Sequence, residues 1–123
     1  MTSFRKERVS EMLLGFLGEQ VRRLHDPRLE AVTLTSVEMT ADLKIARVYW
    51  SMFQLGDAGV TSALAEERIA DSQDALNGVS GLLKQRIGRE LKLRFTPQLQ
   101  FHFDASQIIG GRIEELLRKG DEH

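Results

Sequence analysis

The stretch LNGVSGLLKQRIGRELKLR, residues 76–94, is the part of the sequence that decides the fold. Its apolar residues recur every three or four positions, which is the spacing of one helix face. They are Leu76, Val79, Leu83, Ile87 and Leu91. Gly78 and Gly81 interrupt this pattern, and each lowers helix stability by about 1 kcal/mol relative to alanine. We therefore expect two helices that meet at a kink over residues 78–81.

The same stretch concentrates positive charge in a chain whose net charge is only −1. Residues 82–94 carry five basic residues and one acidic residue, whereas residues 61–79 carry one basic and four acidic residues. A kink would free backbone N–H groups, and its glycines would let a phosphate approach beside the cations. We therefore predict a phosphate-binding site made of the kink and the basic side chains. Its residues are Ser80, Gly81, Lys84, Arg86, Arg89, Lys92 and Arg94.

A second basic cluster lies near the start of the chain, at Arg5, Lys6 and Arg8. We expect it to add a further contact to the same anionic ligand. The alternative for both clusters is that the charges belong to solvated helix faces and bind nothing.

Hydrophobic periodicity predicts the other elements. Residues 5–24 have helical spacing, and Asp26-Pro27 ends this helix because the residue before a proline is disfavoured in helical conformation. Residues 32–39 and 45–53 are expected strands, and the short turn between them makes the pair an antiparallel hairpin. The remaining expected elements are a helical region over residues 60–93, a strand after Pro97 and a helix over residues 106–119.

This element order, α-β-β-α-kink-α-β-α, predicts an α+β domain. The long crossover between the second and third strands favours parallel pairing, so the three-stranded sheet is mixed. Apolar and polar residues alternate in these two strands, which indicates helices on one sheet face and a polar opposite face. We expect one domain over residues 1–119 and a short polar tail at residues 120–123.

The aromatic residues of the strands divide between the two faces of the predicted sheet. Trp50 and Phe101 fall on the core side. Tyr49 and Phe53 fall on the opposite side, where stacking of nucleic-acid bases is conceivable.

Composition excludes several classes of protein. The 123 residues are enough for one core. The chain has no cysteine, which rules out disulfides, thiolate catalysis and zinc held by cysteine. It has no apolar run near the roughly 18 residues of a membrane span, and its first residues do not resemble a secretory leader. We expect a cytoplasmic protein with no membrane partner.

Enzymatic activity is the least favoured of the functions considered. The best candidate for a catalytic or metal site is His102 with Asp104 and nearby Ser106, at the end of the third strand. A catalytic zinc usually needs three protein ligands, and Asp104 or Ser106 is better explained as the N-cap of the following helix. We expect no catalytic residue, no metal, no cofactor and no small-molecule substrate.

Several motifs together resemble one family. Gly78-x-x-Gly81 within the order α-β-β-α-α-β is typical of a KH domain, in which such a loop contacts nucleic-acid backbone. Further motifs, in the same order over much of the chain, are similar to those of ribosome-binding factor A, the bacterial small-subunit maturation factor. They are DPRL at residues 26–29, VEMTxDLxxAxVY at residues 37–49, Ala75-Leu76, Ser80-Gly81, and LxLRxxPxLxFxxDxS at residues 91–106.

This resemblance implies a type II KH fold in which the loop between the two helices is reduced to an Ala-x-Gly kink. It also implies that the protein is a monomer. Val79-Ser80-Gly81 occupies that place here, with valine in place of the alanine. The implied function is binding of the free small ribosomal subunit and its ribosomal RNA during late assembly, in a family that supports growth in the cold. The alternative is a protein-interaction module whose basic helix docks an acidic partner.

Overall fold

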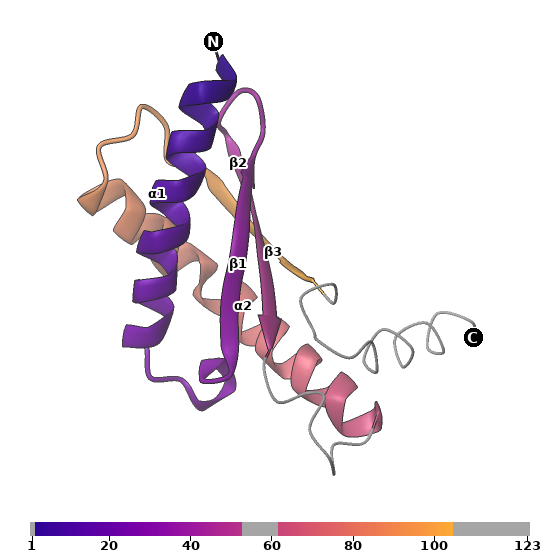
Figure 1. Cartoon of the computed structure of the whole chain (residues 1–123). Coiled ribbons are helices and arrows are strands. Elements are labelled where there is room, and N and C mark those ends of the chain that lie inside the picture. Colours follow the sequence, from indigo (N-terminus) through magenta and orange to yellow (C-terminus); the bar gives the residue numbers. More distant parts are fainter. Residues whose placement is uncertain (1, 53–61, 105–123) are drawn as a thin grey trace.

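The structure is a computed structural model, and it describes residues 2–52 and 62–104 (Figure 1). Within these ranges the order of elements is α-η-β-β-α-β. The elements are α1 (Thr2–Arg23), the 3-10 helix η1 (Pro27–Leu29), β1 (Val32–Met39), β2 (Ile45–Met52), α2 (Ser62–Glu90) and β3 (Gln98–Phe103). Phe53, the predicted helix at residues 106–119 and the tail at residues 120–123 lie outside the described residues, so the domain limits stay a prediction.

The three strands form one mixed sheet in the order β1-β2-β3. β1 and β2 are antiparallel, with Val37 opposite Val48, and a register shift lies between Leu34 and Ser36. β2 and β3 are parallel, with Val48 opposite Phe101. The predicted hairpin and the predicted parallel pairing are both confirmed.

One face of this sheet carries the core. Side chains at alternate positions of β2 and β3 are buried and form a single cluster with apolar residues of both helices. The buried members from the sheet and helices include Val48, Trp50, Phe101, Leu13, Leu17, Leu83 and Ile87. On the opposite face Arg47 and Gln100 are exposed. The helices therefore cover one side of the sheet, as predicted, and Trp50 and Phe101 are core residues.

The carboxylate of Asp26 stabilises the connection between α1 and β1. His25 adopts a positive φ of 53°, and Asp26 then caps η1 by accepting a hydrogen bond from the backbone N–H of Arg28 at 2.9 Å. The Arg28 guanidinium also donates to this carboxylate, at 3.0 Å from Nη2 to Oδ2. Hydrogen bonding from the Arg28 side chain is the main reason why the pKa of Asp26 lies below its usual value.

The predicted kink is wrong: α2 is one continuous helix through Gly78 and Gly81. Neither glycine has a left-handed backbone, and a Cβ added to either would meet no atom within 4 Å. Their cost of about 1 kcal/mol each is outweighed, since Leu76, Leu83 and Ile87 are fully buried at roughly 1.5–3 kcal/mol per side chain. The helix therefore has no second N-terminus at Ser80 whose N–H groups could bind phosphate.

Candidate nucleic-acid interface

The second half of α2 presents two cations on its outer face. Lys84 and Arg89 are exposed at the two edges of this face, about 140° apart around the helix axis, and the exposed Gly81 and Gly88 lie between them. Ser80 is only partly exposed, and its hydroxyl donates back to the carbonyl of Asn77 at 2.9 Å. The outer face thus offers side-chain charge and open backbone, but a ligand would meet a regular helix.

Arg86 takes a different role from the one predicted for it. Its guanidinium is partly buried and donates from Nη1 to Oε1 of Gln20 at 2.9 Å. Gln20 lies on α1 and is only 4% exposed. Arg86 therefore joins the two helices, and its guanidinium is directed toward α1 and away from the outer face of α2.

Lys92 and Arg94 lie beyond the helix that was expected to carry them. α2 ends at Glu90, and Lys92 and Arg94 belong to the connection that leads to β3. This connection returns over the end of the helix at Gly88, where an added Cβ would lie 3.2 Å from Oγ1 of Thr96. The missing side chain of Gly88 lets the connection lie against α2.

This return path forms a small hollow with parts of the chain far away in sequence. Arg5 from α1 lines it together with Lys92 and Arg94, and its volume is about 180 Å³. Figure 1 shows that the start of α1, the β1–β2 turn and the connection after α2 all lie toward the same end of the molecule. The remaining lining residues are Val9, Met39, Leu43, Leu93, Phe95 and Pro97. We call this the cationic hollow.

Phe95 is the residue of this region that the sequence analysis missed. It is 47% exposed, and the guanidinium carbon of Arg94 lies 5.5 Å from the centre of its ring. An aromatic residue directly after a basic one, in a segment that already carries Lys92, is a signal for nucleic-acid binding that could have been used.

The other two predicted residues of α1 lie elsewhere. Lys6 borders a separate hollow of about 350 Å³ whose charged lining also includes Glu7, Glu11 and Glu38. Arg8 is exposed on α1 and does not line the cationic hollow. Of the three cations predicted near the start of the chain, only Arg5 joins Lys92 and Arg94.

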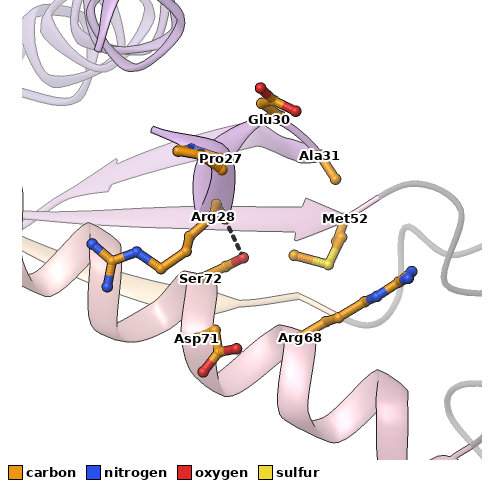
Figure 2. Close-up of a pocket in the computed structure, with 8 residues that line it drawn as sticks. All are labelled: Pro27, Arg28, Glu30, Ala31, Met52, Arg68, Asp71 and Ser72. Carbon is orange, nitrogen blue, oxygen red and sulfur yellow. Dashed lines mark hydrogen bonds between the residues drawn. The ribbon is translucent and has the colours of Figure 1, made fainter. Parts of the chain in front are cut away.

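A larger hollow, of about 610 Å³, lies at the opposite end of β2 beside η1 and α2. Figure 2 shows Arg28, Glu30, Arg68 and Asp71 around it, and the Ser72 hydroxyl donates to the carbonyl of Arg28. The neighbouring carboxylate of Asp26, followed by Asp71 and Asp74, raises the pKa of Arg28. The lining of this charge-balanced hollow thus contains two arginines and two acidic residues.

Of the three candidates for a catalytic or metal site at the end of β3, the structure describes His102 and Asp104, whereas Ser106 lies outside the described residues. The His102 ring packs beside Tyr49, with centroids 5.7 Å apart, on the open face of the sheet. Asp104 donates its backbone N–H to the carbonyl of Trp50 at 2.7 Å. Across residues 2–52 and 62–104 no three His, Asp or Glu side chains are grouped to hold a metal. Within the same ranges, no helix is both long and apolar enough to span a membrane.

Comparisons with known proteins agree along nearly the whole chain. The family model for ribosome-binding factor A matches residues 5–117. Ribosome-binding factor A of Desulfatibacillum aliphaticivorans is 38% identical over 116 residues, which are 94% of this chain and 86% of the relative.

One crystal structure and one homology model fitted into a cryo-EM map share the fold. The crystal structure of ribosome-binding factor A from Thermus thermophilus is 24% identical with a TM-score of 0.64, over 79% of this chain and 93% of that one. A homology model of the Thermus thermophilus factor, fitted into a cryo-EM map of its complex with 30S, is 22% identical with a TM-score of 0.59, over 80% and 93% of the two chains. Together with the family match, these findings place the chain in the ribosome-binding factor A family.

Proposed function

We propose that this protein binds the free small ribosomal subunit through its ribosomal RNA during late assembly, and that the cationic hollow and the outer face of α2 form the contact surface. The family supports the partner, since a member from Thermus thermophilus has been fitted into a 30S complex. The observation that carries the site is that Arg5, Lys92 and Arg94 converge without an acidic residue among the described residues that line the hollow.

The physical basis of this binding is the neutralisation of phosphates. Each phosphate that pairs with a lysine or arginine releases condensed counterions, so affinity falls as salt concentration rises. Lys84 and Arg89 extend the positive surface along α2, and the absent side chain of Gly81 leaves room for an RNA backbone. This function makes and breaks no bond and needs no cofactor. It places the protein in the cytoplasm, where bacterial subunits assemble.

Sedimentation through a sucrose gradient tests the partner. Purified protein is mixed at low salt with small subunits, large subunits and assembled ribosomes in separate tubes, and the fractions are probed for it. We expect it to travel with free small subunits in preference to the other two. Equal association with both subunits, or association with neither, would contradict the proposal.

The cationic hollow also suits an acidic protein, which is the second candidate function. Nuclease treatment separates the two candidates, because an RNA contact is lost when the RNA is digested and a contact with a protein survives. Complexes assembled on small subunits are therefore digested and sedimented again. Retention of the protein on the digested particle would favour the protein partner.

A further inference from the structure

We propose that the cationic hollow receives one unpaired nucleotide of RNA, with its base against Phe95 and its phosphate between Arg5, Lys92 and Arg94. This inference rests on the proposed function, since RNA is the ligand. It goes further by naming an unpaired base, and not only a phosphate backbone, as the feature that is recognised.

The size of the hollow suits a single ring. Its volume of about 180 Å³ is below the roughly 300–1,000 Å³ of pockets that enclose whole small molecules. A ligand held here therefore inserts one group and leaves the rest outside, as a polymer does. Double-stranded RNA keeps its bases stacked inside the helix, so only an unpaired base can enter.

The walls of the hollow are apolar and are held in place by the fold. Met39 and Pro97 are almost fully buried. Leu43 stands in the β1–β2 turn with a positive φ of 61°, and its backbone N–H donates to the carbonyl of Thr40 at 2.9 Å. The backbone N–H of Gln98 donates to the carbonyl of Lys44 at 2.8 Å, which ties this turn to the start of β3. The base would thus enter a preformed site.

Phe95 gives this site its preference for a base. Among the residues that the structure describes, the large hydrophobic side chains left exposed are Met12, Leu82 and Phe95, and only Phe95 is aromatic. A base stacked on its ring would remove that apolar surface from water. The Arg94 guanidinium, already 5.5 Å from the ring centre, is a second planar group on which bases stack.

Charge supplies the second half of the recognition. The charged residues among the described lining of the hollow are Arg5, Lys92 and Arg94, so this lining has a net charge of three positive units. The hollow beside Lys6 is different, because three glutamates accompany its lysine. An anionic group is favoured more strongly where the cations lie without acidic neighbours, and a nucleotide combines such a group, its phosphate, with a flat base that can stack on Phe95.

The test compares two exposed side chains of similar accessibility in the full-length protein. Phe95→Ala is expected to lower affinity for small subunits by about 5- to 150-fold, the range measured for loss of one stacked base. Met12→Ala, which removes a side chain that is 45% exposed on α1, is expected to change affinity less than about twofold. Phe95→Tyr retains the ring and should bind like the parent. Thermal melting confirms that all three variants are folded.

Competition identifies the class of ligand. A single-stranded oligouridine should displace labelled protein from small subunits at a lower concentration than duplex RNA of equal length, and Phe95→Ala should abolish that difference. If Phe95→Ala binds subunits like Met12→Ala, or if duplex and single strand compete equally with the parent, the nucleotide site is wrong. If the parent itself does not bind small subunits, the proposed function fails as well. Stronger competition by polyglutamate than by either RNA would point to an acidic protein.

Discussion

The two hollows at opposite ends of β2 differ in size and in charge, and the smaller one is the better candidate for binding. The charge-balanced hollow beside η1 has more than three times the volume, but Arg28 and Arg68 share its lining with Glu30 and Asp71. The cationic hollow has three cations and no acidic residue among its described lining residues. Uncompensated charge beside an exposed ring, and not volume, is therefore the basis on which we propose the cationic hollow as the RNA site.

The largest expected effect comes from removing the three cations together. Arg5→Ala, Lys92→Ala and Arg94→Ala in one protein should weaken small-subunit binding on the order of 100-fold at about 0.1 M salt, because three phosphate contacts are lost. The slope of log affinity against log salt should fall by roughly 2 to 3 in the same titration.

The matched control removes the arginines of the charge-balanced hollow, Arg28→Ala plus Arg68→Ala. Its affinity and salt slope should stay near those of the parent, because Arg28 is already paired with the Asp26 carboxylate and Arg68 shares the lining of its hollow with Glu30 and Asp71. Equal losses of affinity in the two variants would mean that binding depends on the total charge of the protein. The proposed difference between the two hollows would then be wrong.

A second prediction separates a residue that holds the helices together from residues that contact RNA. Arg86→Met should lower the free energy of unfolding by about 1–2 kcal/mol, because it leaves the buried Gln20 amide without its charged partner. Chemical denaturation measures this loss. Lys84→Ala plus Arg89→Ala should change stability by no more than about 0.5 kcal/mol and instead reduce affinity, since both side chains are exposed. The opposite pattern would assign Arg86 to the RNA surface.

The third prediction uses the glycines of α2. Gly81→Ala should raise the free energy of unfolding by about 0.5–1 kcal/mol, because residue 81 is helical and its added Cβ meets open space. Gly88→Ala should be less stable than Gly81→Ala. Its Cβ would lie only 3.2 Å from Oγ1 of Thr96, so the connection that carries Lys92 would have to shift. Thermal melting compares the two. If Gly81→Ala lowers the free energy of unfolding, residue 81 is not in a regular helix, and the kink predicted from the sequence is present after all.

The smallest expected effect concerns two carboxylates, one near each hollow. The pKa of Asp26 is lowered mainly by the Arg28 side chain, and that of Asp42 mainly by the Thr40 hydroxyl in the β1–β2 turn. Both carboxyl groups have a lower pKa in the folded protein than in the unfolded chain. Their ionised forms therefore stabilise the fold at neutral pH, and this contribution is lost as pH falls below about 3.8.

Titration followed by NMR tests the two causes separately. Arg28→Ala should return the pKa of Asp26 toward its usual value while that of Asp42 stays low. Thr40→Val should do the reverse, because the hydroxyl that donates to Oδ1 of Asp42 at 2.6 Å is removed. If Arg28→Ala leaves the pKa of Asp26 unchanged, the compensation of charge described for the larger hollow is wrong.

Much of the fold could be predicted from sequence because its determinants are local. Alternation along β2 and β3 assigned Trp50 and Phe101 to the core, and both are buried. A short turn required an antiparallel hairpin, and a long crossover favoured the parallel pair. Such patterns depend only on the period of the backbone and the length of the connection, both of which can be counted along the chain.

The sequence by itself thus determined the α+β class, the sheet and its faces, and the presence of basic residues after residue 80. Only the tertiary structure decided that α2 continues through Gly78 and Gly81, because burial of one apolar face outweighs local helix propensity. Only it brought Arg5 to Lys92 and Phe95, and turned Arg86 toward Gln20. These pairings lie far apart along the chain, and they are set by how helices and turns pack over the sheet, which no local pattern records.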